Sequence, residues 1–255
     1  MSFAAVIFDV DGVLVDSPHE HAWRETLEEL MHDSWASLQP STTYTPDRFD
    51  TKLYQTLVSG KPREAGALAI LEYFHVADAP ERARTYAQEK QKKLLALIEA
   101  GQFRVFPDAT RFVLDCLRLG LPIAAASSSK NAGKLLSMIP VASPAGSPSQ
   151  TLHDLFTADV SGRDVAHGKP YPDIFLAAAQ EVHVRPDDCI VVEDAVSGIT
   201  AAKAGGMHAL GIARLHDDAE LREAHADLVV TSLDDVSREA LAHGALKAEV
   251  HDFQA

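Results

Sequence analysis

The first apolar run of the chain, residues 4–8, stops abruptly at Asp9-Val10-Asp11-Gly12. An unbroken run of this kind predicts a strand that is buried on both faces of a parallel sheet and ends in a loop. After residue 101, strand-like and helix-like segments alternate. We expect strands at 121–126, 189–192, 208–213 and 227–231, and helices at 107–119, 130–138 and 197–204. This alternation predicts an α/β fold with a doubly wound, Rossmann-like parallel sheet.

Between the first strand and residue 101 the pattern is helical, and strand-like runs are scarce. Helical periodicity covers residues 18–30, 63–74 and 81–100, whereas a polar stretch with Pro40 and Pro46 predicts a loop. We therefore expect an all-helical cap domain at 17–100, inserted into a core formed by residues 1–16 and 101–255. Hinges near Asp16-Ser17 and Ala100-Gly101 would let this cap open and close as a lid.

Composition narrows the classes of partner. The 255 residues carry 23 Lys and Arg against 37 Asp and Glu, a net charge of −14, which repels nucleic acids and anionic membranes. The longest apolar runs fall far short of the ~18 residues that span a bilayer, and the first residues lack the basic start of a secretory signal. We expect a cytoplasmic protein, a monomer or weak dimer, with no nucleic-acid or membrane partner.

Polar side chains follow the expected strands where those strands end, and open α/β sheets bind ligands at these ends. Asp9 and Asp11 come directly after the first strand, and Gly12 permits a sharp turn. An aspartate can attack a phosphoryl group and form an aspartyl phosphate, while a second carboxylate acts as acid and base. The pattern also fits a plain Asp-rich turn or a Ca²⁺ site.

A serine-rich segment follows the next strand and opens a helix. It offers hydroxyls, backbone N–H groups and a helix N-terminus to an anion such as phosphate. A polar helix cap is the alternative interpretation. The residues concerned are Ser127, Ser128, Ser129, Lys130 and Asn131.

Two further segments add a cation and two acids. Lys169 precedes Pro170, which we expect in the first turn of a helix, and a fixed lysine there could neutralise phosphoryl charge. Glu193 and Asp194 end the apolar strand at 189–192, and their hard oxygen ligands suit Mg²⁺. Taken singly, each segment is also compatible with a solvated loop or turn.

The ordered set Asp-x-Asp-Gly, strand-Ser, Lys-Pro and strand-Glu-Asp resembles the haloacid dehalogenase superfamily, and the helical insert resembles the cap of its β-phosphoglucomutase and phosphoglycolate phosphatase branch. The resemblance implies that Asp9 is the nucleophile and Asp11 the general acid and base. It also implies that Ser127 and Lys169 hold the phosphoryl oxygens. Mg²⁺ would be bound by Asp9, the Asp11 carbonyl and Asp194, with Glu193 as a ligand or as a partner of one.

Cap and loop residues extend the resemblance towards a substrate. Residues 60–64 are similar to the β-phosphoglucomutase segment whose arginine binds the non-transferring phosphate, which makes Arg63 a candidate. Lys90 falls where that family has a cap lysine, and residues 129–131 are similar to its substrate-contacting run. Solvated helix faces are the alternative for Arg63 and Lys90.

A histidine that couples cap closure to catalysis in that family corresponds to His21 by ungapped count from Asp9. Trp23, however, follows His21 by two residues, where the family usually has four, so His19 competes for the role. Longer stretches at 31–46 and 140–150 also depart from the family pattern. The second is rich in Pro, Ser and Gly and predicts an exposed loop.

Three functions follow from these features. The leading hypothesis is a Mg²⁺-dependent phosphatase that hydrolyses a small sugar phosphate or related metabolite. The second is a β-phosphoglucomutase-like isomerase, and the third is a non-catalytic phosphate-binding module, which the presence of both Asp9 and Asp11 disfavours. A dehalogenase would leave Asp11 and the metal-binding acids without a purpose.

Overall fold

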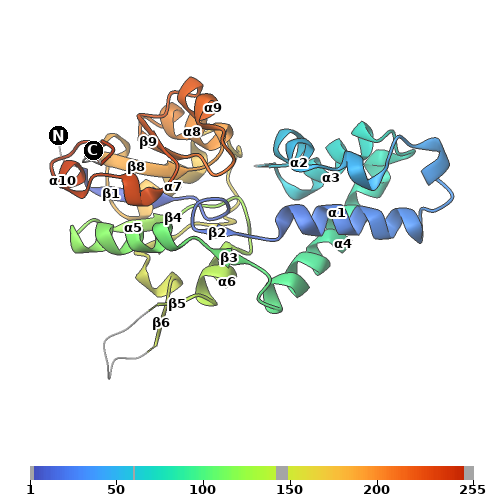
Figure 1. The fold of residues 1–255 in the computed structure, drawn as a ribbon, viewed down its shortest axis with the longest axis horizontal. Coiled ribbons are helices and arrows are strands. Elements are labelled where there is room, and N and C mark those ends of the chain that lie inside the picture. The colour runs from blue at the N-terminus through green and yellow to red at the C-terminus, as the bar shows by residue number, and fades with distance from the viewer. Residues whose placement is uncertain (1–2, 60, 142–148, 250–255) are drawn as a thin grey trace, which may run out of the picture. The chain divides into compact units, whose positions relative to one another are not determined.

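A computed structural model describes residues 3–59, 61–141 and 149–249 of the chain (Figure 1). The chain divides into two units. One consists of Met1–Asp16 together with Val105–Ala255, and the other is the continuous segment Ser17–Arg104. The two segments that connect them include the short strands β2 (Val15–Asp16) and β3 (Arg104–Val105), which form a two-stranded sheet.

The larger unit, called the core here, is built on a six-stranded sheet whose strand pairs are all parallel. The spatial order is β10-β9-β8-β1-β4-β7, so β1 lies in the middle. The strands are β1 (Ala5–Phe8), β4 (Ile123–Ala125), β7 (Ala158–Asp159), β8 (Cys189–Glu193), β9 (His208–Ile212) and β10 (Leu228–Val230). The predicted α/β fold with a parallel sheet and a helical insert is confirmed.

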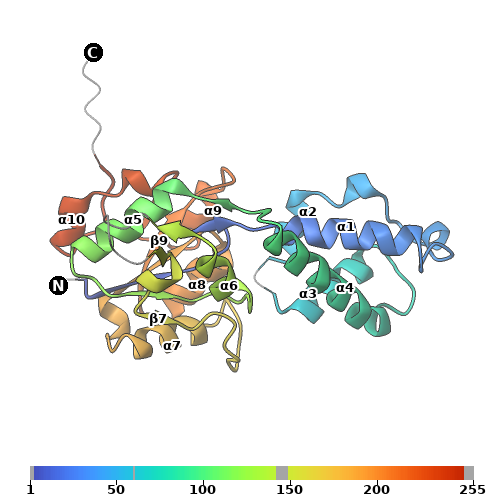
Figure 2. The ribbon, with the colours of Figure 1, turned by 90° about the horizontal axis from the view of Figure 1, so that it is seen from below.

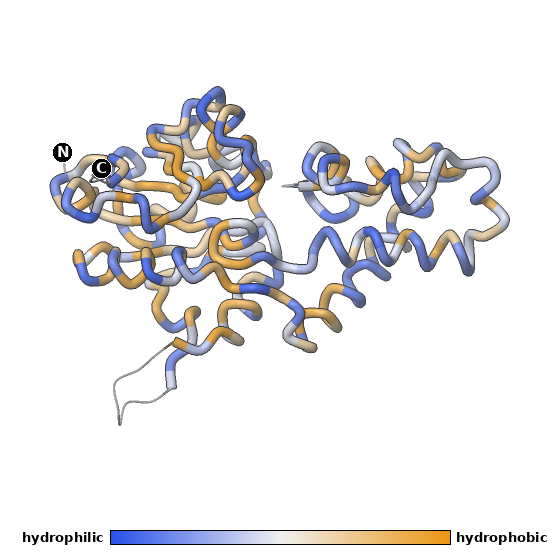
Figure 3. The backbone as a smooth tube through the Cα atoms, in the orientation of Figure 1, coloured by the Kyte–Doolittle hydropathy of each residue, from blue (hydrophilic) through white to orange (hydrophobic). Residues whose placement is uncertain are grey.

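Helices cover both faces of this sheet. Successive side chains of a strand point to opposite faces, and in β1 Ile7 shares an apolar cluster with residues of α7, α8 and α9, whereas Phe8 contacts Phe112 of α5. Figure 2 shows α5 and α7 on opposite sides, and Figure 3 shows the strands between them as largely hydrophobic. The core helices are α5 (Pro107–Arg118), α6 (Ala132–Ser137), α7 (Asp173–Glu181), α8 (Val196–Ala204), α9 (Asp218–Glu223) and α10 (Arg238–Ala242).

In the smaller unit, the cap, the regular elements of the described residues are helices, apart from Arg104 of β3. Its helices are α1 (His19–His32), α2 (Thr51–Leu57), α3 (Arg63–Tyr73) and α4 (Ala79–Glu99). They surround their own apolar core, in which Tyr86 of α4 lies edge-on to Trp23 of α1 and donates a hydrogen bond of 2.7 Å to the Trp23 carbonyl. A separate core of this kind is what an independently packed insert requires.

Short elements account for the remaining regular structure. The 3-10 helices are η1 (Gln39–Ser41), η2 (Pro46–Arg48), η3 (His153–Leu155), η4 (Pro186–Asp188) and η5 (Leu233–Asp235). The strands β5 (Pro140–Val141) and β6 (Gln150–Thr151) pair antiparallel at the two ends of the expected exposed loop, whose residues 142–148 lie outside the described residues.

Two local predictions were wrong, and one strand of the sheet was not predicted. The expected loop after Pro46 contains α2, which has no buried residue and therefore lacks the apolar face that produces a periodic pattern. Pro170 is not in the first turn of a helix, because α7 begins only at Asp173. The strand β7 was not expected, since its two residues are too few to give a pattern. No helix among the described ranges is both long and apolar enough to cross a membrane.

Candidate active site

Parallel register brings the ends of the central strands together. Phe8 of β1 is paired with Ala125 of β4 on one side and with Val192 of β8 on the other. The amide of Asp9 donates a hydrogen bond of 3.0 Å to the Val192 carbonyl, and the amide of Ala126 donates one of 2.8 Å to the Phe8 carbonyl. The residues at and just beyond the ends of these strands, with candidate site residues among them, are therefore neighbours at one edge of the sheet.

A buried lysine joins two acids from different strands. The Nζ of Lys169 lies 2.6 Å from Oδ1 of Asp9 and also forms an ion pair with Oε1 of Glu193. The side chains of all three residues are at most 8% exposed. Desolvation of three charged groups is expensive unless they pair with one another. Asp9, Lys169 and Glu193 therefore form one fixed cluster of paired charges.

In this cluster the negative charges of the acids exceed the positive charge of Lys169. Burial raises the pKa of Asp9, Lys169 opposes that rise, and the charges of Glu193 and Asp11 add to it, so that the net shift is upward. For Lys169, burial disfavours the ammonium form, but Asp9 and Glu193 outweigh it and raise the pKa. Lys169 is therefore protonated and shared between the two carboxylates.

Glu193 is held from several sides. Its Oε2 accepts hydrogen bonds of 3.0 Å from the amides of Asp194 and Ala195. A Cβ placed on Gly198 of α8 would lie 1.8 Å from Oε1 of Glu193, so the glycine provides the space for the carboxylate. Because Glu193 is committed to these amides and to Lys169, its geometry favours a partner role over a metal-ligand role.

Asp194 approaches the loop after β1, residues 9–15, which we call the β1 loop. A Cβ on Gly12 would lie 1.8 Å from Oδ2 of Asp194, and Gly12 has a φ of +80°, a conformation that glycine adopts without strain. Burial raises the pKa of Asp194 strongly, and the charges of Glu193 and Asp9 raise it further. The carboxylates are therefore close enough to repel one another.

The acidic residues at this site bear on whether a metal ion fits there. Within the part of the chain that the structure describes, no three His, Cys, Asp or Glu side chains are grouped to hold a metal by themselves. Asp9 nevertheless lies near enough to Asp194 for its charge to raise the pKa of Asp194, and the charge of Lys169 does not outweigh this rise. With a backbone carbonyl and waters completing the coordination, this chemistry fits Mg²⁺, which binds few carboxylates and keeps several waters.

Asp11 and Gly12 lie in the tight part of the β1 loop. The Gly12 amide donates 2.7 Å to the Val15 carbonyl, and Asp11 forms an isolated bridge with Val15. The amides of Leu14 and Val15 both donate to the carbonyl of Val10, at 2.9 and 3.0 Å. The backbone that carries Asp11 is therefore fixed by its own hydrogen bonds.

The serine segment after β4 is also fixed, though its side chains differ in exposure. Ser127 is buried and its Oγ accepts from the Ser129 amide at 3.1 Å, whereas Ser128 is exposed. Asn131 is buried, while Lys130 is exposed and pairs with Asp164 at 2.9 Å. Helix α6 begins at Ala132, two residues later than expected, so residues 127–131 form a loop before the helix.

The cap contains a second group of candidate residues. Lys90 of α4 is only 2% exposed, its Nζ lies 2.8 Å from Nδ1 of His19, and it sits 4.9 Å from the ring centre of Trp23. Burial lowers the pKa of His19, and the charges of Lys90 and Arg63 lower it further, so His19 is neutral. His21 instead pairs with Glu25 at 3.1 Å. Of the two histidines, His19 is the one that contacts a second candidate residue.

Arg63 is exposed at the start of α3. Gly60, the first residue of the segment that carried its resemblance, lies outside the described residues. Sequence reasoning did not single out two residues that contact the site, Gly198 and Arg214. Arg214 could have been found, because it follows an apolar strand, as the other candidates do.

Comparison with known proteins defines the class. The family model of the haloacid dehalogenase-like hydrolases matches residues 3–206. The chain therefore belongs to the haloacid dehalogenase-like hydrolase family, and it is an enzyme of that family.

Relatives within the family place it in the β-phosphoglucomutase branch. It is 30% identical over 243 residues to the β-phosphoglucomutase of Bacillus subtilis (strain 168), covering 93% of each chain. It is also 30% identical to the fructose-1-phosphate phosphatase YqaB of Escherichia coli (strain K12), covering 82% of this chain and 96% of that protein. The crystal structure of an archaeal β-phosphoglucomutase from Pyrococcus sp. Strain ST 04 superimposes with a TM-score of 0.70 at 30% identity, over 93% and 96% of the two chains.

Proposed function

We propose that this enzyme transfers the phosphoryl group of a small sugar phosphate to Asp9 and then passes it to water. The observation that carries the proposal is the buried ion pair between Asp9 and Lys169, which Glu193 braces. It fixes a carboxylate oxygen at the end of β1 next to a cation that can stabilise phosphoryl charge. Asp9 would attack phosphorus, the bond to the leaving oxygen would break, and an aspartyl phosphate would result.

Mg²⁺ would be held by Asp9, the carbonyl of Asp11 and Asp194, and when bound it would neutralise charge on the phosphoryl oxygens. Lys169 would bind the same group from the side of β8. The hydroxyl of Ser127 and the amides of the loop before α6 would donate hydrogen bonds to the remaining oxygens. These residues bind and orient the phosphoryl group.

Asp11 would move the protons. Its carboxylic acid would protonate the leaving sugar oxygen, and the resulting carboxylate would take a proton from the water that attacks the aspartyl phosphate. Such a role requires a fixed distance from Asp9, which the hydrogen-bonded β1 loop supports. Hydrolysis is the simplest completion, since water needs no further binding site.

The test is a phosphate-release screen over sugar phosphates with Mg²⁺, run with Asp9→Asn and with Asp187→Asn as a control. Asp187 is 61% exposed in an ion pair on η4, so its variant should behave as the wild type. Phosphate release that vanishes in Asp9→Asn alone supports the proposal. Release that persists in Asp9→Asn, or no turnover of any phosphomonoester, refutes it.

A second candidate, a β-phosphoglucomutase-like isomerase, is favoured by two basic residues of the cap, Lys90 and Arg63. A buried lysine held against His19, with Arg63 near enough to affect His19, would suit a substrate with a second phosphate. The identity of 30% to a β-phosphoglucomutase over nearly the whole chain supports the same candidate. In this case Asp9 would exchange the phosphoryl group with a bound sugar bisphosphate.

The two candidates differ in their products. β-Glucose 1-phosphate with glucose 1,6-bisphosphate would yield glucose 6-phosphate without net phosphate release only in the mutase. Arg63→Ala and Lys90→Met should then abolish isomer formation. Lys92→Met, on the same helix but 72% exposed, should leave it unchanged. Equal effects of Lys90→Met and Lys92→Met would count against a substrate role for the cap lysine.

A further inference from the structure

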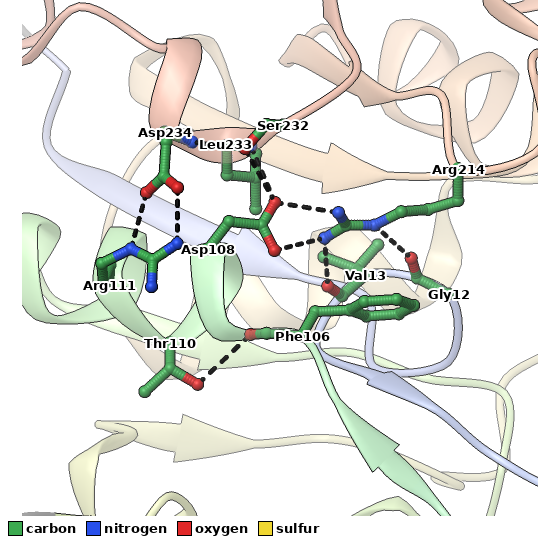
Figure 4. A network of polar contacts seen from close by, with 10 residues as sticks. All are labelled: Gly12, Val13, Phe106, Asp108, Thr110, Arg111, Arg214, Ser232, Leu233 and Asp234. Carbon is green, nitrogen blue, oxygen red and sulfur yellow. Dashed lines mark hydrogen bonds and ion pairs between the residues drawn. The ribbon is translucent and has the colours of Figure 1, made fainter.

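A network of polar contacts at the β1 loop links four segments of the core (Figure 4). Arg214, which follows β9, is its centre. Its guanidinium is bidentate to Asp108 of α5, with Nη1–Oδ2 2.8 Å and Nη2–Oδ1 3.2 Å. Its Cζ lies 4.0 Å from the centre of the Phe106 ring, over the ring face. The Arg214 side chain is 14% exposed and that of Asp108 is 9% exposed.

The same guanidinium reaches the β1 loop. Nη2 donates a hydrogen bond of 3.2 Å to the carbonyl of Val13, and Nε donates one of 3.4 Å to the carbonyl of Gly12. Both carbonyls lie immediately after Asp11. The planar fork of an arginine can serve a carboxylate and two carbonyls at once, which the single ammonium group of a lysine cannot do with the same geometry.

Asp108 is itself anchored, so the arginine has a fixed base. Its Oδ2 accepts a hydrogen bond of 2.9 Å from the amide of Leu233 and one of 3.4 Å from the hydroxyl of Ser232. Burial would raise the pKa of Asp108, but the hydrogen bonds from Arg214 and Leu233 outweigh it and hold the pKa below its ordinary value. Asp108 is therefore ionised, and its charge keeps the guanidinium in place.

Gly12 is thereby confined from two directions. Its α-carbon leaves room for the Asp194 carboxylate, and its carbonyl is directed to Arg214. A rotation of this peptide would disturb both contacts and would move the neighbouring Asp11. The loop also receives support from Phe106, whose amide donates 3.0 Å to the carbonyl of Leu14.

We propose that Arg214, held by Asp108, is a positioning residue that fixes the β1 loop and with it the acid–base carboxylate of Asp11. The inference rests on the proposed function for its kinetic consequence. Its structural part, the fixing of the loop, stands without it. Neither residue belongs to the site motifs, because the pair acts through the backbone carbonyls of Gly12 and Val13.

The chain offers a matched control. Arg111 of α5 and Asp234 of η5 form a second bidentate arginine–aspartate pair, with Nε–Oδ1 2.8 Å, one helical turn along α5 from Asp108. These side chains are 53% and 40% exposed, and Figure 4 shows them pointing toward each other, on the other side of Asp108 from Gly12 and Val13. Loss of this pair should therefore remove an arginine–aspartate contact of similar location without affecting Gly12 or Val13.

The experiment compares Arg214→Gln, Arg214→Lys and Asp108→Asn with Arg111→Gln in the full chain. Hydrogen exchange of the Leu14 and Val15 amides should become at least about tenfold faster in the first three variants and remain unchanged in Arg111→Gln. With the sugar phosphate found in the screen, kcat should fall about 10- to 100-fold in Arg214→Gln, with little change in KM, because a small displacement of an acid–base group has effects of this size.

Arg214→Lys should not restore kcat, since the lysine cannot replace the fork. If Arg214→Gln fails to fold, Asp108→Asn still tests the proposal, because asparagine has nearly the same volume as aspartate. Unchanged exchange and kcat in that variant, or losses equal to those of Arg111→Gln, would overturn the proposal. If the wild type turns over no phosphomonoester, the proposed function has failed, while the exchange rates still decide whether Arg214 fixes the loop.

Discussion

Gly198 lies directly against the carboxylate of Glu193, so that a Cβ at this position would be 1.8 Å from Oε1. The helix α8 therefore provides the space in which Glu193 folds back to the amides of Asp194 and Ala195 and to Lys169. Backbone close packing and the charge network of the site depend on the same residue.

Gly198→Ala should displace Glu193 and loosen Lys169 from Asp9. Alanine is the better helix former by about 1 kcal/mol, so propensity alone would stabilise the variant. We instead expect a lower melting temperature and a kcat lower by about 10- to 100-fold. Calorimetry and the phosphate-release assay measure both, and a stabilised variant with full activity would contradict this account of Glu193.

Gly12→Ala should weaken Mg²⁺ activation, because its Cβ would collide with the Asp194 carboxylate. Gly120→Ala is the control: Gly120 also has a positive φ, +75°, but nothing lies within 4 Å of its Cβ position. Both variants carry left-handed strain of about 1–2 kcal/mol, and only Gly12→Ala should raise the half-activating Mg²⁺ concentration in a titration. Equal Mg²⁺ responses would assign the effect to backbone strain.

Asp108 should make stability depend on pH. Its pKa in the folded chain lies below the ordinary value of 3.8, so its contribution is complete above that value and is lost as the pH falls through the lower one. At pH 7, Asp108→Asn should lower the free energy of unfolding by about 2 kcal/mol, the size of hydrogen bonds to a charged group. The difference from the wild type should shrink as the pH falls below about 4. Urea unfolding followed by circular dichroism at pH 7, 5 and 3 measures it, and a difference that grows on acidification would reverse the assigned direction.

Tyr86→Phe should destabilise the cap by about 1 kcal/mol, because the hydroxyl donates a buried hydrogen bond to the Trp23 carbonyl. Both tryptophans of the chain, Trp23 and Trp35, lie in the cap, so their fluorescence during urea unfolding reports this unit. Tyr73→Phe, 40% exposed on α3, should change the free energy by no more than about 0.5 kcal/mol. An equal loss in the two variants would mean that the buried bond contributes nothing.

The sequence predicts the sheet well because buried parallel strands are nearly pure apolar runs, as Ala5–Phe8 and Cys189–Glu193 illustrate. It fails where burial is slight. Helix α2 has no buried residue, and the hydrogen bond from the Leu53 amide to the side chain of Asp50 marks its start. The start of helix α7 was placed too early, because Pro170 suggested a helix start that the chain makes only at Asp173.

For the site, strand ends predict which residues become neighbours, since Asp9 follows β1 and Glu193 ends β8, the strand that pairs with β1. Their catalytic and metal-binding roles remain predictions. Contacts such as Arg214 with Gly12 join residues far apart in the chain through a backbone carbonyl. Every residue type carries a backbone carbonyl, so the sequence does not indicate which carbonyl accepts such a bond.

The position of β1 in the sheet bears on the order in which a ribosome completes this molecule. β1 pairs with β4 and β8, so its first partner emerges only after Ile123 and its second after Cys189. The cap, a continuous segment with its own apolar core, is synthesised in the interval. Domains generally fold as units during synthesis. We therefore expect the nascent cap to resist proteolysis at a stage when β1, the strand before Asp9, has not yet paired with β4 or β8.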